Sequence, residues 1–522
     1  MNEKTKILFI GLDAADKDLI TQWANEGLLP TFKSLFGKAA WGITNNPIGL
    51  YVGAIWPSFA TAVDAAKHGC YCYSQINPGT YITTNYSVFD LKGEMFWDTL
   101  SRAGRKVAII DLPRTPPTEN VNGIQVVDWL THDPDIIDRL YTWPRSLAPE
   151  IEAKYGKDPI GYCNRLSRNV EGYQHFRDDL ISRSQTKELL SRDFLNQGEW
   201  DLFLTVFSES HCVGHQCWSL HDPTHPKSDR AIADAVGDPI KDVYIALDAA
   251  VGRLLQEVGE ETTVFVLASH GMGPHYDGTF MLDDILCRLE NVKTPTVGIQ
   301  ISKVINSSWE ETPILRQVLQ PLRNYIWKPL RNRFWKSDKP IRIALQEPDN
   351  SNRKCFTIPN NDTYGGIRIN LVDREPNGKI NPGAEYEAFC QQLTEDLLAI
   401  VNVDTGKPLV SRVIRTADFY QGKYLDHLPD LMIEWNREAP ITKVYSPKIG
   451  TLEKSFPGVR TGDHKAEGIV FAMGPSIEPG QVEDAISVMD FAPTIASLLG
   501  VTLPNVDGKP IASFTKKVLV NN

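Results

Sequence analysis

Histidines gather in this 522-residue chain at spacings that suit a metal ion. His211 and His215 stand four residues apart, which puts both imidazoles on one face if the segment is helical. Neutral imidazole is a favoured zinc ligand, and catalytic zinc sites commonly take three protein ligands and leave one position open. His464, in the stretch Thr-Gly-Asp-His-Lys, is the candidate third ligand. The alternative for so short a motif is two histidines with structural hydrogen bonds only.

Other residues able to bind a metal follow apolar runs of the sequence. Asp13 follows the first run, His211 comes shortly after the run at 202–207, and Ser269-His270 follow the run at 263–268. Ligands bind outside the carboxyl ends of the strands in open α/β sheets, so we expect these side chains to meet there. Asp13 could instead cap the next helix, but Asp16 offers another cap, and we predict Asp13 as a metal ligand.

The apolar runs indicate buried strands, and helical patterns lie between them. The expected strands cover residues 7–13, 106–111, 202–207, 263–268 and 468–473. The expected helices include residues 17–35, 243–258 and 488–499. Strands that alternate with helices predict an α/β fold with a mostly parallel central sheet and helices on both faces.

Composition excludes several classes of protein. With 42% hydrophobic and 23% charged residues, the chain is neither disordered nor fibrous. Its net charge of −11 makes it a poor generic binder of nucleic acid. Eight cysteines are too few for a disulfide scaffold and are expected as reduced thiols. We see no targeting segment and no run of about 18–20 apolar residues that could cross a membrane, so we expect a cytoplasmic protein.

Residues 291–362 break the alternation of strands and helices. The segment carries many lysines and arginines among aromatic residues, and prolines divide it into short pieces. We predict an inserted cap here, with residues 1–290 and 363–522 forming the α/β domain. A solvated basic face with packed aromatics is one interpretation of the segment. Contact with an anionic substrate, or peripheral contact with lipid head groups, is the other.

A series of short motifs resembles the type I phosphodiesterase/nucleotide pyrophosphatase branch of the alkaline phosphatase superfamily. The motifs are ILFIGLD at 7–13, WPSFAT at 56–61, KHG at 67–69, FSESHCVGHQCW at 207–218, SHGM at 269–272, YLDHLPDLMIEW at 424–435, GDHKAEG at 462–468 and MDFAPTIASLLG at 489–500. The resemblance implies two metal ions, commonly zinc, over the strand ends, and a Ser or Thr nucleophile that attacks phosphorus. It assigns Asp13 and His270 to one metal, and His215 and His464 to the other.

The chain departs from the family pattern at three positions of the same expected site. Counted back from His68-Gly69, the nucleophile position falls on Val52, which has no nucleophilic atom. Ser269 stands where the family has an Asp, and so does His211. Each departure removes a group on which the family's chemistry depends.

Two accounts of this altered site remain open. In the first, His211, His215 and His464 hold zinc, and Asp13 and His270 form a weaker second site to which Ser269 can add. Water activated by the metal then replaces the side-chain nucleophile. In the second account the protein binds a metal and an anionic ligand without turnover. We favour the first, because one good ligand has replaced another at position 211.

Tyr51, Ser58 and Thr61 are the alternative nucleophiles to this water. Tyr51 adjoins the vacant position, and Ser58 follows Pro57 at an expected helix start. Arg460 and Lys465 flank the third histidine and could meet a phosphate. The predicted activity is metal-dependent hydrolysis of a small phosphoester, first a phosphodiester or nucleotide pyrophosphate. Phosphonate or sulfate esters are the alternative substrates, although the nucleophile segment lacks the Cys that sulfatases modify.

Overall fold

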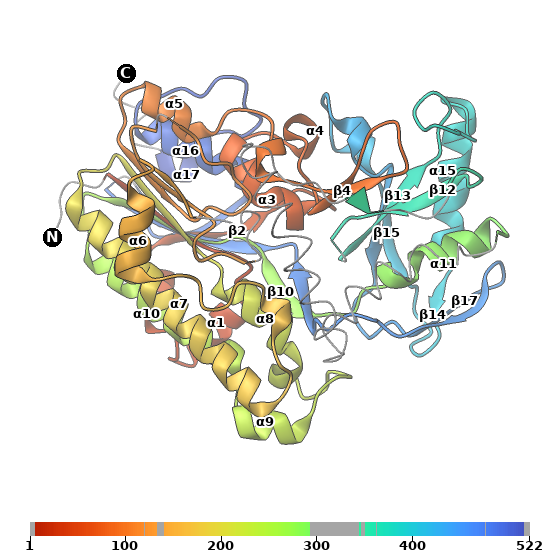
Figure 1. The fold of residues 1–522 in the computed structure, drawn as a ribbon, viewed down its shortest axis with the longest axis horizontal. Coiled ribbons are helices and arrows are strands. Elements are labelled where there is room, and N and C mark those ends of the chain that lie inside the picture. The colour runs from red at the N-terminus through yellow and green to blue at the C-terminus, as the bar shows by residue number, and fades with distance from the viewer. Residues whose placement is uncertain are drawn as a thin grey trace, which may run out of the picture.

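The larger of two groups of elements is built on a nine-stranded sheet, at the left of Figure 1. The structure is a computed structural model that describes residues 6–119, 121–132, 140–292, 344–345, 350–361, 363–475 and 477–515. The strand order is β21-β2-β20-β9-β1-β8-β5-β6-β7. Their bounds are β1 Ile7–Leu12, β2 Ala40–Asn45, β5 Val107–Ile110, β6 Gly123–Val127, β7 Tyr141–Trp143, β8 Leu202–Phe207, β9 Thr263–Ala268, β20 Gly468–Met473 and β21 Gly480–Ser487.

The centre of this sheet is parallel, as predicted. β1 pairs in parallel with β8 and β9, and β5 pairs in parallel with β8 and β6. All six residues of β1 are buried, which is typical of a parallel strand covered on both faces. The predicted strand at 468–473 is present as β20, but it runs antiparallel to β9. An apolar run does not encode strand direction.

Helices cover both faces of the sheet and confirm the predicted fold class. On one face, Leu8 and Ile10 pack with α1 Lys17–Asn25, α2 Pro30–Lys38, α7 Val170–Gln197, α8 Glu209–His221 and α10 Pro239–Gln256. On the other, Ile7 and Phe9 pack with α3 Tyr51–Thr61, α5 Phe96–Arg102 and α16 Phe491–Leu498. Alternate residues of β1 thus feed two separate hydrophobic cores.

Two expected helices differ from the sequence prediction. The pattern at 17–35 forms two helices, because Gly27 adopts φ +81° after α1 and Pro30 opens α2. The expected helix start at Pro57 is wrong, since α3 already begins at Tyr51 and Pro57 lies inside it. Ser58 is therefore an interior residue of α3 rather than a first-turn residue.

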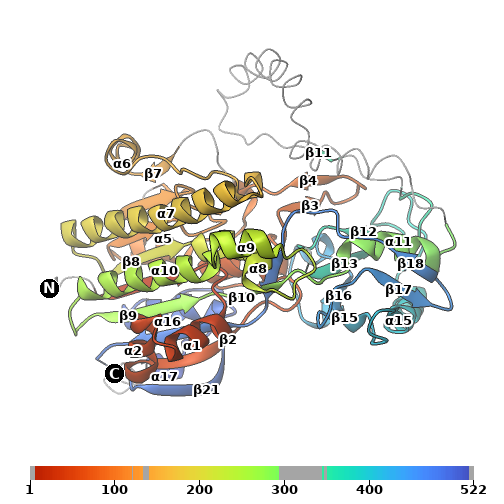
Figure 2. The same cartoon turned by 90° about the horizontal axis from the view of Figure 1, so that it is seen from below.

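The second group of elements has its own core and lies at the right of Figures 1 and 2. Its four-stranded sheet has the order β12-β13-β16-β15. The bounds are α11 Thr279–Leu289, β12 Cys355–Ile358, β13 Tyr364–Ile369, α15 Ala384–Leu398, β15 Val410–Arg415 and β16 Leu431–Trp435. A three-stranded sheet of β14 Val401–Asn402, β17 Lys443–Ser446 and β18 Gly450–Glu453 adjoins it.

The segment predicted as a cap, residues 291–362, is described only in part. Its strand β12 pairs with β13, so this end of the segment belongs to the four-stranded sheet. The basic and aromatic residues between 316 and 342 lie outside the described residues. Among the helices that the structure describes, none is both long enough and apolar enough to span a membrane.

Candidate metal centre

Helix α8 places two histidines at the carboxyl edge of the central sheet. The chain leaves β8 at Phe207 and enters α8 at Glu209, so His211 and His215 lie one turn apart. Their ring centroids are 4.9 Å apart. Ser210 ties the helix to the end of β1 by donating a hydrogen bond of 2.7 Å to the carbonyl oxygen of Asp13. The expected helix and its shared histidine face are therefore present.

The hydrogen bonds of these two histidines leave two ring nitrogens facing one another. His211 Nδ1 lies 2.6 Å from Asp13 Oδ2, and His215 Nδ1 lies 2.8 Å from the carbonyl oxygen of Gly462. A neutral ring that donates from Nδ1 carries its lone pair on Nε2. The two Nε2 atoms are only 3.1 Å apart. Two lone pairs so close repel each other unless a cation lies between them, so this pair fits a metal.

His464 completes the cluster from a different part of the chain. Strand β19 Gly462–Lys465 pairs antiparallel with β10 Gly271–Pro274 beside α8. The His464 ring lies 4.7 Å from that of His211 and 4.6 Å from that of His215, between centroids. His464 Nδ1 also lies 2.9 Å from Nε2 of His270. The structure thus brings together the three histidines named from the sequence.

Two groups of closely spaced donor atoms share His215. In one, donors of His215, Asp463 and His464 lie within 4.8 Å of one another, and in the other those of His132, His211 and His215 do. The donor atoms of His211 and His464 therefore belong to two different groups, and His215 belongs to both. Asp463 adjoins His464 in the sequence motif but was not predicted as a ligand.

Asp13 is buried and accepts hydrogen bonds on both carboxylate oxygens. Trp56 Nε1 donates to its Oδ1 at 2.7 Å, and His211 contacts its Oδ2. Burial alone would raise the pKa of Asp13, but its close contact with His211, with smaller effects of His270 and Trp56, lowers this pKa to about 2. The helix N-cap is supplied by Asp16, which accepts from two backbone amides of α1. Asp13 is therefore an ionised carboxylate that orients His211.

Ser269 and His270 form a short chain of contacts toward the same centre. Ser269 Oγ lies 2.9 Å from His270 Nδ1, and His270 Nδ1 lies 4.0 Å from Asp13 Oδ1. Burial lowers the pKa of His270 to about 4, although the charge of Asp13 opposes this. Burial likewise holds the pKa values of His215 and His464 well below the usual range. Neutral imidazoles are the form that binds a metal.

Two of the three candidate nucleophiles, Tyr51 and Ser58, differ in their contacts. Tyr51, the first residue of α3, donates a hydrogen bond of 3.2 Å to the carbonyl oxygen of His464. Burial raises its pKa, so the phenol stays protonated at neutral pH. Ser58 is fully buried, 2.9 Å from Nε2 of His68. His68 Nδ1 accepts from the amide of Cys70 at 3.1 Å, so its Nε2 carries the proton and cannot serve as the base for Ser58.

Two basic residues flank His464, and only one of them contacts the cluster. Arg460 Nη1 lies 3.4 Å from Nε2 of His215. Lys465 forms ion pairs with Asp16 at 3.0 Å and Asp18 at 3.1 Å. Arg460 is therefore the better placed of the two to meet an anion at the cluster.

His132 was not predicted from the sequence, although it belongs to the cluster. Its ring stacks on that of His211, with centroids 3.9 Å apart and an interplanar angle of 17°. Burial lowers its pKa well below the usual range, so the ring is neutral. His132 lies in a loop after β6, and no other histidine stands near it in the sequence at a spacing that indicates a shared metal. Only the fold shows that it lies beside His211.

Comparisons with known proteins agree with this architecture. Residues 7–463 match the model of the family called type I phosphodiesterase/nucleotide pyrophosphatase. The structure of phosphonoacetate hydrolase from Sinorhizobium meliloti, in complex with phosphonoformate, is similar with a TM-score of 0.51 and 13% identity over 99% of this chain and 96% of that one. An inactive murine ectonucleotide pyrophosphatase/phosphodiesterase 5 in complex with AMP gives a TM-score of 0.46 and 12% identity over 97% of each chain. Among curated proteins, none matches by sequence.

Proposed function

This chain belongs to the type I phosphodiesterase/nucleotide pyrophosphatase family, and we propose that it is a metal-dependent hydrolase of small phosphoesters, first of phosphodiester or nucleotide pyrophosphate bonds. The observation that carries the proposal is the 3.1 Å approach of two Nε2 atoms, of His211 and His215, beside the ring of His464. An imidazole set favours zinc. A bound divalent ion would polarise the phosphoryl group and lower the pKa of a coordinated water.

The surrounding residues prepare the ligands for that ion. Asp13 accepts from Nδ1 of His211, and the carbonyl oxygen of Gly462 accepts from Nδ1 of His215. Such outer contacts fix the tautomer and the ring orientation of a metal-binding histidine. Arg460, 3.4 Å from His215 Nε2, supplies a positive charge for the phosphate of the substrate. We keep Asp13 and His270, with Ser269, as a weaker second metal site.

We propose that water, rather than a side chain, attacks phosphorus. Val52 occupies the second position of α3, where the family places its nucleophile, and carries no hydroxyl. The raised pKa of Tyr51 and the burial of Ser58 both disfavour attack by these groups.

The Val52→Thr variant tests this proposal about the nucleophile. The wild-type protein should form no phosphorylated intermediate with a chromogenic diester, whereas the variant should form one. Quenched-flow samples examined by intact mass spectrometry would show it. A phosphorylated tyrosine or serine in the wild-type protein would contradict attack by water.

Metal analysis and a substrate panel test the function itself. The reduced protein should bind zinc and turn over at least one of bis(p-nitrophenyl) phosphate, p-nitrophenyl phosphate, a p-nitrophenyl nucleotide ester and phosphonoacetate. His215→Ala should lose zinc and turnover together. His221→Ala, at the far end of the same helix, should keep both, because His221 contacts Asp238 rather than the cluster.

A binding protein without turnover is the second candidate function. It is favoured by the absence of a hydroxyl at Val52 and by Ser269 in place of a carboxylate. Zinc bound by the wild-type protein and lost in His215→Ala, with no turnover of any ester in the panel, would support it. We also propose a cytoplasmic location, because all eight cysteines are free thiols, as is typical of a reducing compartment.

A further inference from the structure

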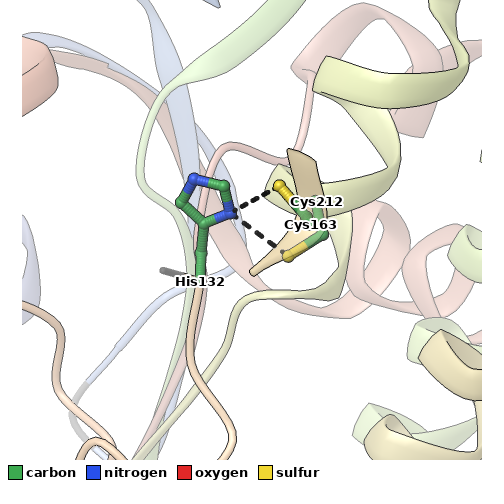
Figure 3. A group of neighbouring side chains, drawn as sticks. All are labelled: His132, Cys163 and Cys212. Carbon is green, nitrogen blue, oxygen red and sulfur yellow. Dashed lines mark hydrogen bonds between the residues drawn. The ribbon is translucent and has the colours of Figure 1, made fainter. Parts of the chain in front are cut away.

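Three metal-binding side chains meet beside the histidine cluster, from three separate segments of the chain. His132 comes from the loop after β6, Cys163 from the short 3-10 helix Cys163–Arg165, and Cys212 from α8 (Figure 3). His132 Nδ1 lies 3.2 Å from the sulfur of Cys212 and 3.5 Å from that of Cys163. All three donor atoms lie within 4.8 Å of one another. Figure 3 shows both sulfurs on the same side of the imidazole ring.

Each sulfur also receives an N–H donor from a neighbouring side chain. Arg183 Nη2 lies 3.4 Å from the sulfur of Cys212, and Gln216 Nε2 lies 3.4 Å from that of Cys163. Donors aimed at sulfur stabilise the thiolate, which is the form of cysteine that binds a metal. Arg183 is itself fully buried and paired with Glu209 at 2.9 Å, so this donor is held in place.

We propose that His132, Cys163 and Cys212 form a further metal site, distinct from the histidine centre and from the weaker site at Asp13 and His270, that binds zinc through two thiolates and one imidazole. Two sulfurs and one nitrogen form a known ligand set of zinc, and they leave one tetrahedral position open. Two thiolates balance the charge of the ion, and their protons pass to solvent when it binds. Both cysteines are buried, which excludes water from the two metal–sulfur bonds.

The proposed ion would also hold His132 in place beside the histidine centre. His132 stacks on His211, so an ion that anchors His132 holds the loop after β6 against a ligand of the proposed catalytic zinc. The site does not depend on the proposed hydrolytic function. A protein without turnover could still bind this ion.

Cobalt(II) reports on sulfur ligation and separates the two sites. Reduced protein, stripped of metal and titrated with cobalt(II), should develop a thiolate-to-cobalt charge-transfer band in the near ultraviolet. The double variant Cys163→Ser/Cys212→Ser should lose this band and one equivalent of bound metal. His215→Ala should keep the band, because it removes only the histidine centre. Cys217→Ser, a buried cysteine on the same helix, should also keep it.

Zinc X-ray absorption provides the second measurement. The wild-type protein should show zinc–sulfur scattering at about 2.3 Å that the double variant lacks. The milder variant His132→Gln, which keeps both thiols, should weaken cobalt binding at least tenfold, and circular dichroism would verify that it folds. A reduced wild-type protein without the band, a band that persists in the double variant, or a Cys163–Cys212 disulfide that forms in preference to metal binding would each overturn the proposal.

Discussion

At the scale of single side chains, the position of protons decides what the cluster can bind. His211 and His215 each direct Nδ1 to a protein acceptor and Nε2 to the other ring. The same carboxylate of Asp13 that contacts His211 also accepts a hydrogen bond from Trp56. Asp13 therefore acts on the candidate histidine centre through its contact with His211.

Replacing Asp13 by Asn tests that role. An amide has one acceptor oxygen, so it cannot serve Trp56 and His211 as the carboxylate does. We expect zinc affinity to fall about 10–100-fold, as is usual when an outer partner of a histidine ligand is lost. Calorimetric titration of the metal-free protein measures it. Trp56→Phe removes only the other hydrogen bond and should have a smaller effect; equal losses would contradict the argument.

The residues of the site were predictable to different degrees. The spacing of His211 and His215 contains the helical period, and His464 could be added because its motif has a place in a family pattern. His132 and Cys163 carry no such signal. His132 lies in a loop and Cys163 begins a three-residue 3-10 helix, and only the packing of α8 against these segments brings them to Cys212. Tertiary contacts of this kind are not encoded in local periodicity.

At the scale of elements, the centre depends on how closely α8 approaches β19. A Cβ at Gly462 would lie 2.1 Å from the carbonyl oxygen of Gly214 in α8, so only glycine allows this contact. The same contact region holds His215, whose Nδ1 bonds to Gly462, and the amide of Thr461 donates to the carbonyl of His215 at 2.8 Å. The distance between the two elements that carry the candidate ligands is therefore set by a position that accepts only glycine.

Gly462→Ala should separate α8 from β19 and disturb the centre. We expect a loss of about 1–3 kcal/mol in the free energy of unfolding, typical of overpacking, and at least a tenfold loss of zinc affinity. Gly273→Ala is the matched control on the neighbouring strand, because its Cβ would meet only the flexible Lys465 side chain at 3.0 Å. Denaturant titration and zinc calorimetry of both variants decide the point. Unchanged zinc affinity in Gly462→Ala would refute it.

Helix α5 carries an aspartate that opposes folding at neutral pH. Burial raises the pKa of Asp98 to about 6, and the charge of Glu94 adds to this against a hydrogen bond from Thr118. In the unfolded chain the same group titrates near about 4. Between these pH values the folded state keeps a proton that the unfolded state has lost. Stability due to this group therefore falls as pH rises from about 4 to about 6.

Asp98→Asn should stabilise the protein at pH 7 by about 1 kcal/mol after allowance for partial exposure, and the gain should vanish near pH 4. Asp193→Asn should behave oppositely. The hydrogen bonds from Lys154 and Tyr155 lower the pKa of Asp193, so this variant should lose stability at neutral pH and approach the wild type in acid. Urea midpoints measured from about pH 2 to pH 8 test both signs. A pH-independent gain in Asp98→Asn would contradict the assignment.

At the scale of the whole molecule, apolar runs in the sequence predicted the strands of the central sheet. They predicted the strands of the second group of elements poorly. The strands at 7–12, 107–110, 202–207 and 263–268 are buried on both faces, so they read as continuous apolar segments. β15 is buried only at Val410 and Ile414, is exposed at Ser411 and Arg412, and belongs to a separate small sheet. Its short strands join segments far apart in sequence, and local pattern does not show which of them pair.

Metal binding should couple the stability of two elements that lie far apart in the sequence. The proposed zinc ligands come from α8 and β19. In the sequence, α8 precedes the whole second group of elements and β19 follows it. An ion that binds only the folded state adds about 4 kcal/mol at a thousandfold excess over its dissociation constant. Zinc should therefore raise the unfolding temperature of the wild-type protein, and a chelator should reverse the gain.

The chelator experiment discriminates between a structural and a local role of the histidine centre. Far-ultraviolet circular dichroism should stay unchanged on chelation, because two large apolar cores hold the central sheet together. His221→Ala should keep the zinc-dependent gain. His215→Ala should lose the part that comes from the histidine centre and keep a smaller part from the thiolate site. If zinc stabilises His215→Ala as strongly as the wild type, the rings at 211, 215 and 464 do not share an ion.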